Sequence, residues 1–193
     1  MEFKPITEDR YEDVIRHLRD NFADEPLNKA AKLCSRGTGH HDLEHHSIKT
    51  LEDNMSIMAV DENNKRKLQI NDDENFKKIF QLLYTLNLKE NIFEHFHVEK
   101  AFDIRILSVD NLYRGQGIAK GLVKHSEEVA REYDFELMKA DATGLFSQKI
   151  LKSNGFEVLS EQYYDKYVDE FGRILLPVES PHIKLQLLYK LLK

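Results

Sequence analysis

The spacing of apolar side chains predicts a helix close to the start of the chain. Apolar residues recur every three or four positions over 11–22, as expected when one face of a helix packs on a core. Thr7, followed by Glu8 and Asp9, is a candidate N-cap for this helix. A short strand over 2–6 is predicted to precede it.

The segment after this helix is predicted to change direction. Pro26 disfavours helical dihedral angles at Glu25, so residues 24–28 should bend before a second short helix over 27–33. The glycines and the four histidines of 35–47 predict a loop or a frayed helix instead.

Alternation of apolar and polar residues then predicts a hairpin. Residues 55–60 have the pattern of a strand, 61–65 that of a turn, and 67–70 can return as a short antiparallel partner. Apolar residues at helical spacing over 76–93 predict the next helix or helix pair.

The second half of the chain alternates strands and helices. The predicted elements are a strand over 103–109, a turn over 113–119 that enters a helix running to 133, a strand over 135–141, a helix over 146–153, and strands over 156–159 and 182–188. This order indicates an α/β fold in which a mixed central sheet is flanked by helices. The length of 193 residues, without a Gly- or Pro-rich linker, predicts a single domain over 1–193.

Charge and composition narrow the classes of function. The 28 basic and 34 acidic residues give a net charge of −6, which removes the bulk electrostatic case for binding nucleic acid or an anionic membrane. Cys34 is the only cysteine, so no internal disulfide can form, as is usual in a reducing compartment. No apolar run approaches the roughly 18 residues that a membrane-spanning helix needs. We therefore expect a soluble, cytoplasmic monomer without nucleic-acid or membrane partners.

The glycine-containing turn is a candidate anion site. Gly115 and Gly117 lie where the chain leaves a strand and enters a helix, so several backbone N–H groups can converge there without side chains in the way. The simpler alternative is that the two glycines only permit a tight turn. The turn lacks the Gly-Lys-Ser/Thr of a nucleotide-hydrolysing loop and the third glycine of a dinucleotide-binding loop.

Four segments of the chain carry a resemblance to a known family. Residues 114–119, Arg-Gly-Gln-Gly-Ile-Ala, resemble the Arg/Gln-x-x-Gly-x-Gly/Ala pattern of the GNAT acetyltransferase superfamily. The segments 22–28, 106–110 and 181–183 resemble the insect arylalkylamine (dopamine-type) N-acetyltransferases, in the family's order. The most specific feature is the Asp-Glu-Pro-Leu-Asn bend at 24–28 combined with the glycine turn.

This resemblance implies a fold and a cosubstrate. The expected fold is the GNAT fold, a mostly antiparallel sheet in which one parallel strand pair splays apart around acetyl-CoA. The backbone of Leu107 and Val109 would bind the pantetheine of acetyl-CoA. The residues implied to bind the diphosphate end are Arg114, Gly115, Gln116, Gly117, Ile118, Ala119 and Lys120.

The resemblance also implies three catalytic residues. Glu25 aligns with the family's glutamate and would act as the general base, because an alkylammonium group of pKa near 10 must lose a proton before it can attack. Counting back from Gly155-Phe156, the family's two hydroxyl positions fall on Thr143 and Ser147, and Ser147 would protonate the departing thiolate. The simpler alternatives are that Glu25 and Thr143 cap helices and that Ser147 lies on a helix surface.

The implied reaction is transfer of the acetyl group from acetyl-CoA to an arylalkylamine such as dopamine, tyramine, octopamine or serotonin, by direct attack in a ternary complex. The alternatives are an aliphatic acceptor such as agmatine or a polyamine, a protein acceptor, and a non-catalytic acyl-CoA-binding homologue. The short polar segment 65–73 departs from the family pattern, which leaves the acceptor open.

The histidines of 40–46 and Cys34 are further candidates for a chemical site. The histidines at 40, 41, 45 and 46 have spacings that could bind zinc on a helix, but no fitting Cys or acidic partner accompanies them, and a solvated polar loop is the simpler interpretation. Cys34 has no neighbouring base in the sequence, which disfavours an acetyl-enzyme route. No metal is expected.

Overall fold

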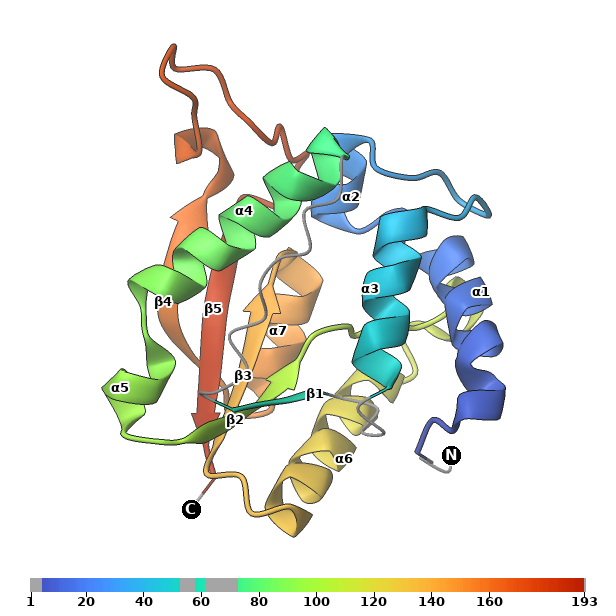
Figure 1. Ribbon diagram of the computed structural model, residues 1–193, viewed down its shortest axis with the longest axis vertical. Helices are drawn as coiled ribbons and strands as arrows, with labels where there is room; N and C mark the ends of the chain where they lie inside the picture. Colours follow the sequence, from blue (N-terminus) through green and yellow to red (C-terminus); the bar gives the residue numbers. More distant parts are fainter. Residues whose placement is uncertain (1–4, 53–57, 62–72, 193) are drawn as a thin grey trace.

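The described residues form one five-stranded mixed sheet. The computed structural model describes residues 5–52, 58–61 and 73–192 (Figure 1). The sheet has the order β1-β2-β3-β5-β4, in which β2 and β3 are parallel and the other neighbouring pairs are antiparallel. The strands are β1 (Met58–Asp61), β2 (Lys100–Ile104), β3 (Leu137–Ala142), β4 (Glu157–Tyr163) and β5 (Lys184–Leu191). The predicted mixed, mostly antiparallel sheet with one parallel pair is confirmed.

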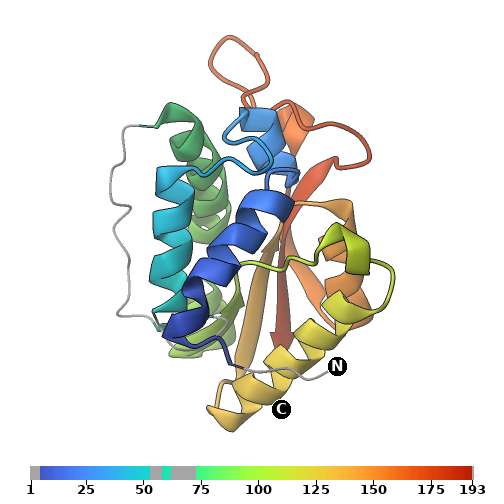
Figure 2. The same ribbon diagram turned by 90° about the vertical axis from the view of Figure 1, so that its right-hand side faces the viewer.

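Helices cover both faces of this sheet. Figure 2 shows α3 and α4 on one side of the sheet and α6 and α7 on the other. The α-helices are α1 (Tyr11–Asn21), α2 (Pro26–Ala31), α3 (His41–Leu51), α4 (Glu74–Lys89), α5 (Ile92–Phe96), α6 (Ile118–Glu132) and α7 (Leu145–Ser153). Short 3-10 helices are η1 (Glu8–Arg10), η2 (Asn111–Tyr113) and η3 (Tyr164–Lys166).

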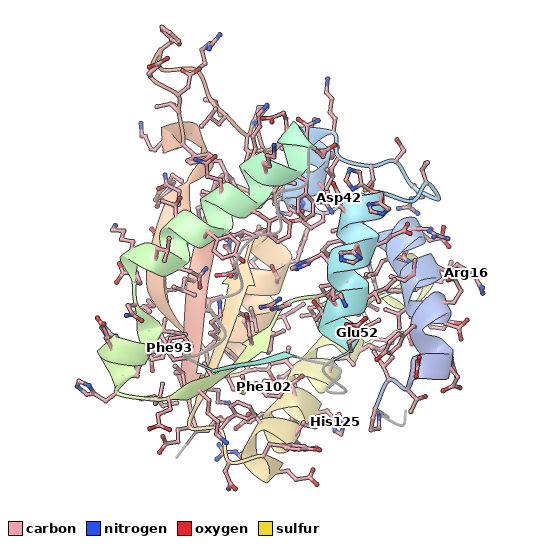
Figure 3. The ribbon with its side chains drawn as sticks, in the orientation of Figure 1. Arg16, Asp42, Glu52, Phe93, Phe102 and His125 are labelled. Carbon is pink, nitrogen blue, oxygen red and sulfur yellow. The ribbon has the colours of Figure 1, made fainter. Side chains whose placement is uncertain are left out.

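Two hydrophobic cores follow from the alternation of side chains along the strands. Ala101 and Leu137 face one side of the sheet, where they pack with residues of α2, α4 and α5. Their neighbours Phe102 and Met138 face the α6 and α7 side. Phe102, labelled in Figure 3, is fully buried and packs edge-on against the ring of Phe135, with centroids 5.4 Å apart.

The parallel pair separates after three residues. The pairing of β2 with β3 ends at Ile104 and Ala140, whereas Asp141 and Ala142 of β3 still pair with β5. The strand predicted over 103–109 is therefore corrected: it begins earlier and ends at Ile104, and residues 105–110 have no strand structure. A pair that parts in this way is the splay expected of the GNAT fold.

The helix α3 was not expected as a well-formed element, since 35–47 was predicted as a loop or a frayed helix. His40 caps it, accepting a hydrogen bond from the Leu43 N–H through Nδ1 at 3.3 Å. The Arg19 guanidinium of α1 also binds both carboxylate oxygens of Glu44, at 2.7 and 2.8 Å. Arg19 lies 25 residues from Glu44 in the sequence, so periodicity alone does not predict this support for the helix.

Other boundaries differ from the predictions at strand ends. The strand predicted over 156–159 extends to Tyr163, and the last strand occupies Lys184–Leu191 instead of 182–188. The strand predicted over 2–6 lies mostly outside the described residues, and so do the return strand over 67–70 and nearly all of the polar segment 65–73. Within the described ranges, no helix is both long enough and apolar enough to cross a lipid bilayer.

Candidate active site

The glycine turn is exposed and shaped by two left-handed residues. Gly115 and Gly117 both have φ of +78°, a conformation that side-chain-bearing residues rarely adopt. A Cβ atom built on either glycine would meet no heavy atom within 4 Å. Backbone conformation, together with open space for a ligand, therefore explains the glycines better than tight packing does.

The start of α6 presents unpaired donors at this turn. The Gly121 N–H donates to the Gly117 carbonyl at 3.0 Å, so the amides of residues 118–120 precede the first hydrogen bond of the helix. Arg114 turns back and donates through Nε to the Val109 carbonyl at 3.0 Å, which closes the loop between the splayed segment and the helix. Unpaired amides at a helix N-terminus are the chemistry that binds phosphate.

Helix α1 holds the splayed segment in place. His17 Nε2 lies 2.9 Å from Ser108 Oγ, and the Asn111 N–H donates to Asn21 Oδ1 at 3.3 Å. Leu107 points the other way and packs against the α6 and α7 core. The backbone around Leu107 and Val109 is therefore supported by side chains, while its edge toward β3 is not paired with that strand beyond Ile104.

Glu25 occupies the bend between α1 and α2. Its Oε2 accepts hydrogen bonds from the Leu27 N–H at 3.0 Å and the Asn28 N–H at 2.9 Å, so it caps α2. Asn28 in turn donates through Nδ2 to the Phe22 carbonyl at 3.0 Å, fixing the bend. The residue as a whole is half-buried, yet its second oxygen, Oε1, is inaccessible and has no hydrogen-bond partner among the described residues.

Burial of this carboxyl group raises the pKa of Glu25 above its ordinary value of 4.5. The Thr143 hydroxyl and the amides of Asn28 and Leu27 act in the opposite direction, because each stabilises the charged form. Thr143 thus faces the carboxyl, although its hydroxyl does not complete a hydrogen bond to Oε1. Glu25 therefore caps α2 through Oε2, as the simpler alternative predicts. Its raised pKa and an Oε1 atom without a described partner are also features expected of a general base.

Thr143, in the turn after β3, lies beside this carboxyl, and Ser147 follows it in the first turn of α7. A Cβ atom on Gly144 would come within 3.2 Å of Pro26 Cγ, so the turn and the bend lie in direct contact. Ser147 donates through Oγ to the Gly144 carbonyl at 2.9 Å. Glu25 and Thr143 are therefore brought together, with Ser147 one helical turn further along.

Three residues that support the site are not among the predicted catalytic or cosubstrate-binding residues. Tyr164 donates to the Thr143 carbonyl at 2.6 Å, and Gln148 donates through Nε2 to the Ala142 carbonyl at 3.0 Å. His182 accepts from the Leu145 N–H through Nδ1 at 3.0 Å. His182 lies in the Pro-His-Ile segment that carries part of the family resemblance, whereas no motif marks Gln148.

The histidine segment does not form a metal centre. Within the described part of the chain, no three His, Cys, Asp or Glu side chains come together in an arrangement that could hold a metal ion. His40 is used as a cap, and the rings of His41 and His45 stack with centroids 6.3 Å apart.

Burial, followed by the charges of Glu25 and Glu44, raises the pKa of the Cys34 thiol.

Comparison with known proteins identifies the class of enzyme to which this site belongs. The acetyltransferase (GNAT) family matches residues 88–156, which run from the end of α4 through the splayed segment, the glycine turn and α7. The match covers the parts that the geometry singles out as a cosubstrate site. The splayed parallel pair and the glycine turn thus belong to a GNAT acetyltransferase.

Solved structures narrow the class further. Arylalkylamine N-acetyltransferase 2 from Aedes aegypti is 44% identical, with a TM-score of 0.94 and coverage of 100% of this chain and 99% of that chain. The putative arylalkylamine N-acetyltransferase 7 from the same mosquito is 25% identical, with a TM-score of 0.85 and coverage of 97% and 85%. Drosophila melanogaster polyamine N-acetyltransferase, 16% identical over 98% of both chains with a TM-score of 0.80, shares the fold. The chain belongs to the arylalkylamine N-acetyltransferase family of the GNAT superfamily.

Proposed function

We propose that this protein transfers the acetyl group of acetyl-CoA to the primary amine of an arylalkylamine, with Glu25 as the general base. The observation that carries the proposal is the inaccessible Glu25 Oε1, which has no described partner and lies at the carboxyl-terminal end of β3. The 44% identity to a mosquito arylalkylamine N-acetyltransferase supports the choice of acceptor class.

The residues present fit acetyl-CoA, which supplies an activated acyl group when bound. The amides of 118–120 and the open, left-handed glycines suit its diphosphate. Arg114 and Lys120 are exposed beside the turn and add positive charge there. The backbone of Leu107 and Val109, left without a β3 partner, suits the amides of pantetheine.

Glu25 solves the proton problem of the acceptor. An alkylammonium group is almost entirely protonated at neutral pH, and a carboxyl whose pKa is raised is a stronger base than an ordinary glutamate. Oε2 is engaged with the Leu27 and Asn28 amides, so Oε1 is the oxygen left to accept the proton, directly or through a water molecule. The deprotonated amine then attacks the acyl carbon, the new C–N bond forms, and the C–S bond breaks.

The departing thiolate takes its proton from Ser147, and the Ser147 oxygen is reprotonated by the second proton that the nitrogen loses once the new C–N bond has formed. The Ser147 hydroxyl proton points to the Gly144 carbonyl in this structure, so the side chain must rotate about χ1 to donate elsewhere. Thr143 keeps its hydroxyl toward Glu25 and stabilises the carboxylate before proton transfer. Cys34 supports direct transfer, because a thiol whose pKa is raised stays protonated and is a poor nucleophile.

Turnover with a panel of free amines, followed by CoA release, tests the proposal. We expect acetylation of dopamine, tyramine, octopamine or serotonin, and a loss of at least about 100-fold in kcat for Glu25→Gln at neutral pH. Glutamine at this position retains the oxygen that caps α2, so folding is preserved. Activity of Glu25→Gln should recover partly at high pH, where the free amine forms without help.

Other outcomes would identify the alternatives. Preference for agmatine or a polyamine would replace the arylalkylamine, and reaction with peptides alone would indicate a protein acetyltransferase. Binding of acetyl-CoA without turnover on any amine would indicate a non-catalytic homologue. A Glu25→Gln variant with the wild-type pH–rate profile would remove Glu25 as the base.

A further inference from the structure

Tyr164 is a buried polar residue that the proposed reaction does not use. It is the first residue of η3, only 3% exposed, and its hydroxyl donates to the Thr143 carbonyl at 2.6 Å across 21 residues of sequence. Its ring packs in the core beneath α2 and α4, and this packing fixes the position of the hydroxyl. A buried phenol that makes one short hydrogen bond to the turn bearing Thr143 calls for an explanation.

We propose that Tyr164 is a positioning residue: by holding the Thr143 carbonyl, its hydroxyl sets the orientation in which the Thr143 side chain faces Glu25. This inference rests on the proposed function, because Tyr164 would affect catalysis only by way of Thr143 and the general base Glu25. Tyr164 itself touches neither substrate in this account.

The turn between β3 and α7 shows why such a hold is needed. Its other carbonyls are held from within the turn and α7: the Ala142 carbonyl accepts from Gln148, and the Gly144 carbonyl accepts from Ser147 Oγ. The Thr143 carbonyl is held instead by a distant segment, η3. Two contacts therefore tie this turn to distant segments, Tyr164 on the Thr143 carbonyl and His182 on the Leu145 N–H, and loss of the first would free the peptide after Thr143 to rotate.

The ionisable groups near Glu25 determine whether a displaced Thr143 can be detected in the pH–rate profile. Among the described residues, the Tyr164 phenol from η3 and the Cys34 thiol from the segment after α2 both interact with the charge of the Glu25 carboxyl. Burial, followed by the charge of Glu25, raises the pKa of both. Neither group carries charge near neutral pH, so neither contributes to the acidic limb of the pH–rate profile, where Glu25 titrates.

Tyr164→Phe removes only the hydroxyl and tests the proposal. We expect kcat to fall about tenfold, the size of one lost hydrogen bond, with KM for acetyl-CoA unchanged. The acidic limb should move to higher pH, because a displaced Thr143 no longer lowers the pKa of Glu25. The matched control is Tyr189→Phe, which removes a 3.0 Å hydrogen bond to Glu157 on the far strands of the sheet.

A double mutant separates positioning from general destabilisation. Thr143→Val leaves the carbonyl in place but removes the hydroxyl, so it should shift the acidic limb in the same direction. Adding Tyr164→Phe to Thr143→Val should shift the limb no further, since both act through one contact.

A Tyr164→Phe variant whose acidic limb stays at the wild-type pH, or whose shift adds fully to that of Thr143→Val, would overturn the inference. If Tyr164→Phe lowers the melting temperature but leaves the acidic limb of the pH–rate profile unchanged, the inference is also wrong. If Glu25→Gln abolishes turnover while Tyr164→Phe behaves like Tyr189→Phe, only the role of Tyr164 fails. If Glu25→Gln remains active, the proposed base itself fails.

Discussion

Two buried acidic regions on the same side of the sheet differ in how completely their charges are compensated. Lys139 of β3 lies 3.4 Å from Asp103 of β2 and 3.4 Å from Asp141, and donates to Asn87 Oδ1 of α4 at 2.8 Å. Asn87 Nδ2 also lies 3.0 Å from both oxygens of Asp141. Glu25, in contrast, has no described cation beside it and one oxygen without a described partner.

The difference indicates which of the two regions is structural. Burial alone would lower the pKa of Lys139, but the charges of Asp103 and Asp141 raise it, so the ammonium stays charged and the network is internally satisfied. A satisfied network ties α4 to the parallel pair and leaves little for a ligand to bind. The unsatisfied carboxyl of Glu25 costs stability, and a cost of this kind is typical of a functional site.

The largest effect on stability is expected from Lys139→Met. The substitution keeps an unbranched chain of similar length but leaves Asp103 and Asp141 close together without their shared cation, which should lower the free energy of unfolding by about 3–5 kcal/mol. Urea denaturation measures this loss. Folded protein should keep its kcat, and Lys49→Met, at an exposed pair with Glu52, is the control that should change little. A large loss of kcat without a loss of stability would place the network in the active site.

A smaller loss is expected from Asn87→Leu. The amide both accepts from Lys139 and donates to Asp141, so its removal should cost about 1–3 kcal/mol while the ion pairs persist. Thermal and urea unfolding give the value, with Gln81→Leu on the exposed face of the same helix as the control. An effect as large as that of Lys139→Met would mean that the amide, and not the ammonium, organises the network.

The sequence predicted those parts of the site that depend on neighbouring residues. The bend at Glu25 and the turn at Gly117 follow from local backbone preferences, since proline and glycine restrict or widen the allowed dihedral angles. The partners of the turn after β3 could not be predicted in this way. Tyr164 reaches Thr143 across 21 residues, and His182 reaches Leu145 across 37, so no local pattern marks either contact.

The same limit applies to the fold. The order of strands and helices in the second half followed from periodicity and from the stop at Gly155, whose φ of +84° suits a glycine after a helix. The helix at 41–51 was understated because the Arg19–Glu44 pair that supports it joins two helices. The early end of β2 was missed because an apolar segment that leaves its neighbouring strand has the same alternation as one that stays paired.

The smallest effect on the free energy of unfolding is expected from Glu25→Gln. Unlike the two substitutions above, it should increase stability. The folded-state pKa of Glu25 lies above its ordinary value of 4.5, so the folded state holds the proton more tightly than the unfolded chain does. The stability contributed by this group is therefore fully present below pH 4.5 and is lost as the pH rises through the folded-state pKa.

The glutamine of this variant has no such charge to bury, and it keeps a cap oxygen for the Leu27 and Asn28 amides. The variant should thus gain stability relative to the wild type between about pH 4.5 and 7, by less than the losses above, because Thr143 and the two amides already offset part of the cost. Urea unfolding of both proteins across this range measures the gain. A wild type that becomes more stable than the variant as the pH rises would show that the charge of Glu25 is compensated in the folded state.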